Sequence, residues 1–403
     1  MKTIRIARRL SVLLPAAVLA FHGLAATTIT PNGSELTYDV PDNETYPLNE
    51  AFPTTATTII KTGGGTLEVN APNTGRTGLI VDIRGGTVKS GLNERVFGTS
   101  DTVKVSPGAS LWYTGHPANL YTYIFGTVEI AGDGPDHNGA FYYTGSGGSD
   151  IMITTLKVMA GAKVGGTGRF GARITNMGGN TLTNAFTSAD NPYVFRYFDW
   201  MGSTQITNPG DIVQLSKKTV IQASTTTLFN GVDPTENTWT FATSSTLSLL
   251  TDNPVFPWAV RAVGSPTLQF SGTDATMNGP IIGAGSDTTT FEVTSDKAFG
   301  QTLTINADVT NLNFKVSKTN ILVKVKNANF YSRVLSMAGG GALEVEGGSS
   351  HKISVGYGLT HLLNGARVRF NDAGTIWTPG LIDCSGENFA TDGKVSTDRK
   401  STR

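Results

Sequence analysis

One short motif recurs along the chain and constrains its fold more than any other feature. The motif is Gly, then Gly or Ala, then any residue, then Leu or Val. Its copies begin at Gly64, Gly85, Gly108, Gly161, Gly340 and Gly365. Neighbouring copies start 21 (64 to 85), 23 (85 to 108) and 25 (340 to 365) residues apart. A coil of a parallel β-helix needs about 20–25 residues for its short strands and turns. The motif therefore predicts a stack of such coils.

Three copies define the residues that we assign to the structural repeat. They are Gly64, Gly65 and Leu67; Gly85, Gly86 and Val88; and Gly340, Gly341 and Leu343. The small residues allow a tight turn, and the Leu or Val that follows is expected to point into the coil. We therefore predict an all-β parallel β-helix that forms one elongated domain. A β-sandwich, which also has short strands and tight turns, is the alternative.

Composition agrees with short strands and turns and excludes several classes of protein. Glycine occurs 48 times, and charged residues are only 15% of the chain, against about 25% in ordinary soluble domains. The 31 basic and 31 acidic residues give a formal net charge of zero, which argues against nucleic acid and against a polybasic membrane surface as partners. The single cysteine, Cys384, excludes a disulfide framework and cysteine-based metal sites.

Both ends of the chain are expected to lie outside the repeat. Residues 1–25 combine four basic residues with an apolar stretch too short to span a bilayer, a pattern typical of a secretory signal peptide. Residues 26–58 contain four prolines and are predicted to cap the first coil. The β-helix is assigned to residues 59–397. Residues 398–403, DRKSTR, match a reading frame of an adapter oligonucleotide, so we exclude them and expect the natural chain to continue.

Some of these repeats resemble a known family. Residues 61–69 (KTGGGTLEV), with 73–75 (NTG) and 85–88 (GGTV) after them, resemble the autotransporter-associated β-strand repeat. Residues 131–140 and 165–170 are similar to the turn and the Gly-x-Gly-Arg-aromatic elements of such passenger-like proteins. The resemblance covers about a third of the chain, mostly within residues 59–210. It implies a secreted, right-handed β-helix passenger on a bacterial surface, and it supplies no catalytic residues.

Few residues form a pattern that would carry out chemistry. The histidines have no partner at metal-ligand spacing, and the sequence has no nucleophile-elbow or phosphate-loop motif. The best acidic candidate is Asp133 with Asp136, because carboxylates grouped on a loop can hold Ca²⁺. The alternative is an ordinary turn, since Asp and Gly are turn residues. We therefore predict no cofactor and favour a protein without enzymatic activity.

Aromatic residues concentrate in two segments. One contains Trp112, and the other spans residues 193–200 (YVFRYFDW). If residues 193–200 form a strand, Arg196 and Trp200 share one face, and only the opposite face can line the coil. Arginine is costly to bury without a partner. Arg196, Trp200 and Trp112 are therefore the candidates for stacking on a glycan or a protein. The alternative is a loop or widened coil that covers both faces.

These patterns lead to one function hypothesis and two alternatives. We expect a bacterial protein that is secreted or held on the outer cell surface and acts as a non-enzymatic adhesin or scaffold. Its expected partner is an extracellular glycan or a protein on a host or cell surface, and the mature chain has no predicted membrane span. The alternatives are a polysaccharide lyase or hydrolase, or a carbohydrate-binding module, since the fold alone does not separate them. A membrane barrel or anchor beyond residue 397 would favour the surface-displayed adhesin over the two alternatives.

Overall fold

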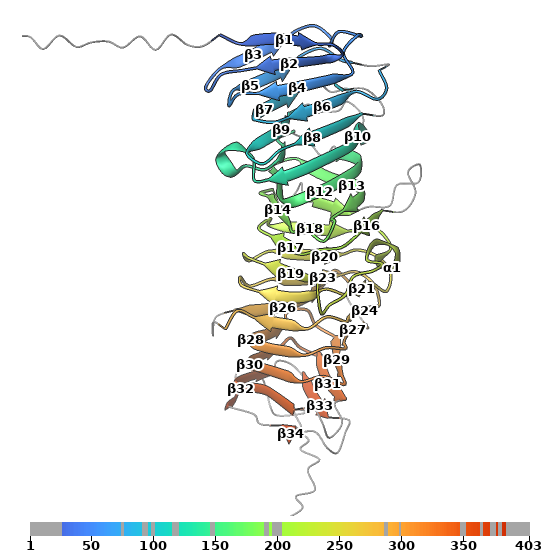
Figure 1. Cartoon of the computed structure of the whole chain (residues 1–403). Helices are drawn as coiled ribbons and strands as arrows, with labels where there is room; N and C mark the ends of the chain where they lie inside the picture. Colours follow the sequence, from blue (N-terminus) through green and yellow to red (C-terminus); the bar gives the residue numbers. More distant parts are fainter. Residues whose placement is uncertain are drawn as a thin grey trace, which may run out of the picture.

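The protein is an elongated stack of parallel β-coils (Figure 1). The structure is a computed structural model. It describes residues 26–383 except 74–75, 91–95, 98–100, 115–120, 146–149, 189–192, 196–203, 286–288, 298–299, 347–351, 363–365, 371–375 and 378–380. The coils form a β-solenoid of about 12 turns. The prediction of an all-β parallel solenoid is confirmed, and the sandwich alternative is wrong because strands in successive coils pair in parallel.

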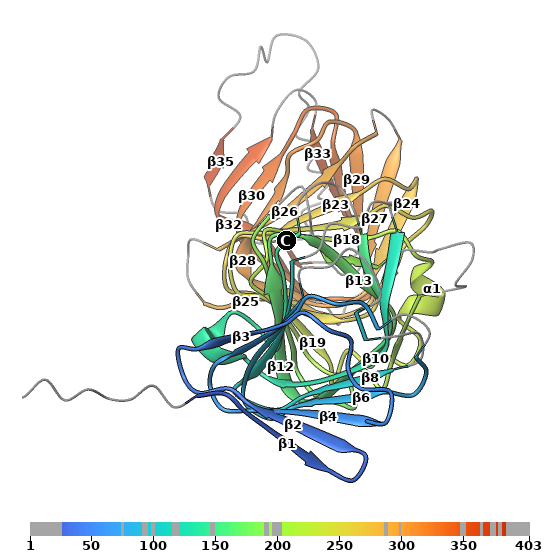
Figure 2. The same ribbon diagram turned by 90° about the horizontal axis from the view of Figure 1, so that it is seen from above.

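The N-terminal end begins with a hairpin. Strand β1 (Thr28–Asn32) pairs antiparallel with β2 (Glu35–Asp39). The residues of β1 are all exposed, and β1 lies over the end of the stack (Figures 1 and 2). Pro31 in β1 has no N–H group that could pair with a further strand. Proline on an edge strand is a common way to prevent pairing with another chain. From β2 onward, the pairings among the described strands are parallel.

Strands from successive coils form three faces, of which two begin at the N-terminal end. The first face contains β2, β4 (Thr58–Thr62), β6 (Ile80–Ile83), β8 (Thr102–Val105), parts of β10 (Tyr121–Gly132), β12 (Asp150–Gly166) and β13 (Arg169–Asn176), then β16 (Gln205–Thr207). The short helix α1 (Thr225–Leu228) contacts both β16 and β21 (Val255–Phe256). Beyond it the same side contains β21, β24 (Asp274–Met277), β27 (Gln301–Ile305), β29 (Ile321–Lys326), β31 (Ala342–Glu346) and β33 (Arg367–Phe370).

The second face runs the full length of the stack. It contains β3 (Thr45–Leu48), β5 (Thr66–Val69), β7 (Gly86–Ser90), β9 (Ala109–Tyr113), β11 (Phe141–Tyr143), the end of β12, β14 (Leu182–Phe186), β17 (Ile212–Gln214), β19 (Thr238–Phe241), β22 (Ala259–Ala262), β25 (Ile281–Gly283), the starts of β28 (Val309–Val316), β30 (Phe330–Met337) and β32 (Lys352–Leu362), and β34 (Ile376–Trp377).

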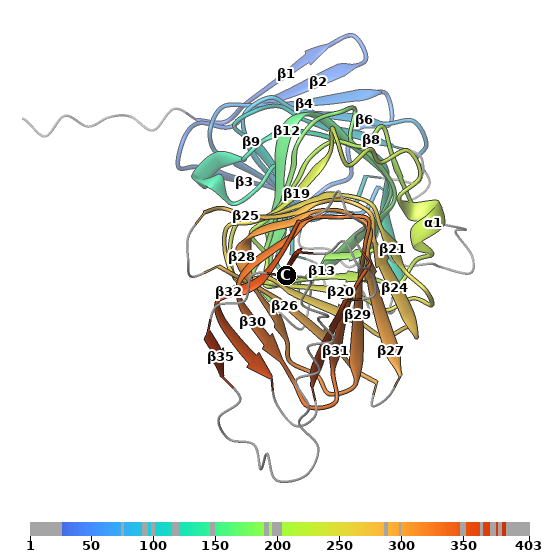
Figure 3. The ribbon, with the colours of Figure 1, turned by 90° about the horizontal axis from the view of Figure 1, so that it is seen from below.

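Among the described residues, the third face has strands from β10 onward. It contains the starts of β10, β12 and β13, then β15 (Tyr193–Phe195), β18 (Lys218–Ile221), β20 (Thr246–Leu249), β23 (Thr267–Phe270), β26 (Thr290–Ser295), the ends of β28, β30 and β32, and β35 (Leu381–Asp383). Figure 3 shows β29 and β31 on one side of the C-terminal coils and β28, β30 and β32 across from them.

Connecting segments close the third side of the first coils. The buried Asn73 accepts a hydrogen bond from Phe52 N (2.9 Å) and donates one to Val96 O (2.7 Å). Arg76 donates to the carbonyls of Phe52, Pro53 and Ala56. Asp101 Oδ1 accepts from Leu79 N at 2.9 Å. Side chains thus satisfy backbone groups that a strand ladder would otherwise satisfy.

The core follows from alternation along each strand. In β5 and β29 buried residues alternate with half-buried ones, which is the period of two that a strand imposes. The motif residues Leu67, Val88 and Leu343 are all fully buried. Most of the buried apolar residues from Leu36 to Val345 form one cluster, as expected when each coil covers the next.

The glycines of the motif lie at the turn before each inward residue. Gly64 and Gly65 precede β5, Gly85 precedes β7 and Gly86 begins it. Gly86 has a φ of 63°, and a Cβ there would overlap the Gly65 carbonyl oxygen. Glycine is therefore required at Gly86 for both its dihedral angle and its close contact with the previous coil. Gly340 and Gly341 occupy the turn before β31.

The coils between about residues 210 and 340 keep their register although the motif fades there. Large aromatic side chains fill this part of the interior. Trp239 and Trp258 are fully buried with ring centroids 5.4 Å apart, and Phe256 lies 5.3 Å from Trp239. Within the described residues, no helix is long and apolar enough to cross a membrane.

Candidate functional site

The second face carries a row of outward side chains over its first five strands. Strand register pairs Pro47 with Glu68, Glu68 with Lys89, Lys89 with Trp112, and Trp112 with Tyr142. We call these five residues the outer row. Because neighbouring strands lie about 4.8 Å apart, the outer row runs along the solenoid axis with one side chain for each coil.

Local sequence alternation places these side chains outside. On either side of each outer-row residue the neighbours point inward, as Leu67, Val88, Leu111 and Phe141 show by being fully buried. A strand that buries one set of alternate residues must expose the other set. The outer row is therefore fixed by the same pattern that builds the core.

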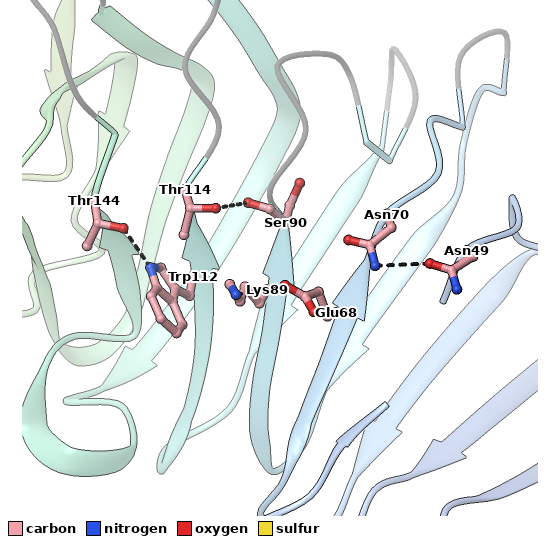
Figure 4. Close-up of polar contacts among 8 residues, drawn as sticks. All are labelled: Asn49, Glu68, Asn70, Lys89, Ser90, Trp112, Thr114 and Thr144. Carbon is pink, nitrogen blue, oxygen red and sulfur yellow. Dashed lines mark hydrogen bonds and ion pairs between the residues drawn. The ribbon is translucent and has the colours of Figure 1, made fainter. Parts of the chain in front are cut away.

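Direct contacts join the outer row from coil to coil. Glu68 Oε1 lies 2.7 Å from Lys89 Nζ, and both side chains are 26% exposed. The same Lys89 Nζ lies 5.0 Å from the centroid of the Trp112 ring, within cation–π range. On the next coil, the Tyr142 ring is 6.1 Å from that of Trp112 at an interplanar angle of 58°. Trp112 Nε1 donates to Thr144 Oγ1 at 2.9 Å (Figure 4).

A second row of polar side chains runs beside the outer row (Figure 4). It consists of Asn49, Asn70, Thr114 and Thr144, which we call the amide–hydroxyl row. Asn70 Nδ2 donates to Asn49 Oδ1 at 3.2 Å, and Thr114 Oγ1 donates to the Ser90 carbonyl oxygen at 3.1 Å. Both asparagines are exposed and both threonines are half-buried. The row offers neutral donors and acceptors to solvent.

A turn between β10 and β11 stands at the edge of this face. It contains a short 3₁₀ segment, Pro135–His137, and is closed by a hydrogen bond from Gly139 N to Asp133 O (2.7 Å). Ser110 Oγ donates to Gly139 O at 2.8 Å, and Lys163 Nζ donates to the carbonyl oxygen of His137 at 2.6 Å. The turn is thereby fixed to β9, which also carries Trp112, and to the end of β12.

The structure places Asp133 and Asp136 in this turn. Asp133 Oδ2 lies 3.6 Å from His137 Nδ1, with side chains 59% and 83% exposed. Asp136 is exposed and has a φ of 57°. Among the residues that the structure describes, no three His, Cys, Asp or Glu side chains are grouped so that they could hold an ion. Asp133 and Asp136 therefore lie in an exposed turn of the backbone.

Of the three predicted stacking residues, only Trp112 can be placed. It lies in the outer row with Lys89 over its ring, so stacking by a ligand on that ring face would require Lys89 to move. Arg196 and Trp200 lie outside the described residues. Tyr193 at the start of their segment is buried, 5.2 Å from the Phe170 ring. Val194, on the opposite side of that strand, is also buried.

The sequence offered no role for two buried ionisable residues. Lys61 is fully buried, and its Nζ donates to the carbonyls of Thr62 (2.7 Å), Gly63 (2.8 Å) and Gly85 (3.1 Å). Burial lowers the pKa of Lys61 to about 8. Burial also raises the pKa of Asp101 to about 6. Lys61 lies three residues before the first motif copy at Gly64, and this position was the one signal available in the sequence.

Comparison of the chain with protein-family models, with characterised proteins and with solved structures gives no match.

Proposed function

We propose that the chain is a secreted or surface-displayed bacterial β-solenoid that acts as a non-enzymatic adhesin or scaffold. The observation that carries this proposal is the second face, on which two rows of side chains run along the axis and are fixed by contacts between coils. A fixed surface of this kind suits attachment, because its side chains lose little freedom on binding. The leader-like residues 1–25 and the resemblance to the autotransporter-associated repeat support export.

Cell-surface display can be tested in a bacterial host that expresses the full chain. Antibody labelling and protease treatment of intact cells should detect the protein outside, and these cells should be retained on glycan-coated or host-cell surfaces. The matched control is the same chain without residues 1–25, which should stay inside the cell and give no retention. Full-length protein that remains protected from protease, or displayed protein that retains no cells, would contradict the proposal.

A polysaccharide lyase or hydrolase is the second candidate. One observation favours it, namely the Asp133–His137 pair in an exposed turn next to two aromatic side chains, since carboxylate and imidazole groups serve in acid–base catalysis. Purified full-length protein incubated with neutral and acidic polysaccharides separates the two functions. Binding without new reducing ends or unsaturated products supports the adhesin, whereas product that disappears in Asp133→Asn supports the enzyme.

A further inference from the structure

The second face of the first five coils has the properties of a site for a polymer. We propose that an uncharged, extended polysaccharide binds along the outer row and the amide–hydroxyl row, with its chain parallel to the solenoid axis. This inference rests on the proposed function and names the ligand class and the residues of the attachment surface.

The shape of the site indicates a chain rather than a compact ligand. Strand register places one outer-row side chain on each of five successive coils, which spans about 19 Å at about 4.8 Å for each step. The amide–hydroxyl row follows the same direction (Figure 4). A linear polymer that repeats one unit along its length can meet such a series of positions, whereas a single small molecule would meet one or two.

The charges of the site favour a neutral polymer. The carboxylate of Glu68 and the ammonium group of Lys89 are paired at 2.7 Å, so they add no net charge to the outer row. Amides and hydroxyls make up the second row, and these groups both donate and accept hydrogen bonds. Sugar hydroxyls need that mixture, whereas a polyanion would be attracted by an excess of Lys and Arg.

Trp112 and Tyr142 supply the apolar part of the site. The Nε1 bond to Thr144 and the position of Lys89 hold the Trp112 ring in one orientation, and Tyr142 packs beside it. Aromatic side chains contact the apolar faces of sugars through large, rigid surfaces. Because these two rings are already held in place, binding costs little of their own side-chain entropy. A sugar that stacks on the Trp112 face under Lys89 must displace the Lys89 side chain.

The turn of residues 133–139 borders the aromatic pair, because it ends just before β11 and is bonded to β9. Ser110, two residues before Trp112, holds the turn through Gly139 O. The exposed Asp133 and His137 side chains add hydrogen-bonding groups at this border. A polysaccharide on the outer row would therefore contact the Trp112 and Tyr142 rings and, beside them, the polar groups of the turn.

The test is titration of the full-length protein with defined oligosaccharides. Cellohexaose, mannohexaose and chitohexaose represent neutral chains, and hexagalacturonate represents an acidic one. Calorimetry and tryptophan fluorescence should detect binding to at least one neutral hexamer and weaker binding to hexagalacturonate. Binding to none of the neutral hexamers, or stronger binding to hexagalacturonate, would overturn the proposal.

Variants locate the site. Tyr142→Ala and Trp112→Ala are expected to weaken binding at least tenfold, Asn70→Ala to weaken it several-fold, and Tyr142→Phe to retain it because the ring remains. The matched control is Tyr331→Ala, which removes a half-buried tyrosine of β30 outside both rows. If Tyr331→Ala weakens binding as much as Tyr142→Ala does, the assignment of the site is wrong. Circular dichroism establishes whether each variant is folded. If Tyr142→Ala and Trp112→Ala are unfolded, the binding affinity of Asn70→Ala tests the site.

The same variants separate this inference from the proposed function. Displayed cells that carry Tyr142→Ala should lose retention on a coating of the neutral polysaccharide that the wild type binds. Retention that survives in both Tyr142→Ala and Asn70→Ala would refute this site while leaving the adhesin function intact. If displayed cells that carry the wild-type protein are not retained on any coating, the adhesin function itself would be refuted.

Discussion

The first coils and the later coils close their third side in different ways. From β2 to β9 the described residues of each coil form strands on two faces, and connecting segments lie on the third side. From β18 onward the third face is a parallel ladder that runs through β20, β23 and β26. The early coils therefore rely on particular polar side chains, whereas the later coils rely on backbone pairing.

This difference shows what a solenoid needs in order to keep stacking. Every buried N–H and C=O group must have a partner, and a ladder supplies partners whatever the side chains are. Without a ladder, the chain supplies them one at a time, through Asn73, Arg76 and Asp101. The early coils should thus be sensitive to single polar substitutions, and the later coils to loss of apolar volume.

The largest effect is expected from loss of aromatic volume in the later coils. Trp239→Ala removes a fully buried ring that packs on Phe256 and Trp258 and donates to Gln214 Oε1 at 3.0 Å. We expect a loss of about 3–5 kcal/mol in the free energy of unfolding, measured by urea denaturation, with faster hydrogen exchange around β19 and β22. Trp112→Ala, at a half-buried position, should cost only about 1 kcal/mol. Equal losses would show that the interior is not packed as described.

A smaller effect should follow removal of a polar connector in the early coils. Asn73→Ala leaves Phe52 N and Val96 O buried without their partner, so we expect a loss of about 2–3 kcal/mol in unfolding free energy. Asn278→Ala is the control, since its exposed amide only bridges to Asn306 and should change stability by less than about 0.5 kcal/mol. Similar losses of unfolding free energy in the two variants would contradict the view that the early coils depend on particular polar side chains.

Lys61 should make stability depend on pH in the alkaline range. Its pKa is lowered from 10.5 to about 8 by burial, so between these two pH values the unfolded chain binds more protons than the folded one. The unfolding free energy of the wild type should therefore rise as pH increases from 8 to 10.5, and the penalty is fully present below 8. Lys61→Met should flatten this part of the profile. A profile unchanged by the substitution would show that another group is responsible.

Asp101 should give the smallest effect, with the opposite slope at acidic pH. Burial raises its pKa from 3.8 to about 6, so between these values the folded state binds more protons than the unfolded state. Stability should therefore fall as pH rises from about 4 to 6. Asp101→Asn keeps an acceptor for Leu79 N and should abolish the slope in urea melts at a series of pH values. A steeper slope in the variant would contradict the assignment.

Alternation and the glycine motif determined the fold class from the sequence alone. Leu67, Val88 and Leu343 are inward because a strand has a period of two and each follows a small-residue turn. The same pattern places Glu68 and Trp112 outside. In contrast, the acidic turn at Asp133 could be read from sequence either as an ion site or as a turn, because carboxylates next to glycine suit both.

Only the tertiary structure decided which side chains meet. Successive residues of the outer row from Glu68 to Tyr142 lie 21 to 30 residues apart in the chain. The length of each coil therefore decides whether their side chains come into register. Sequence periodicity gives the direction in which a side chain points, but the partner across coils depends on every insertion between two strands. For the same reason the burial of Lys61 against carbonyls of two coils, and the absence of third-face strands among the described residues before β10, could not be predicted from the local pattern.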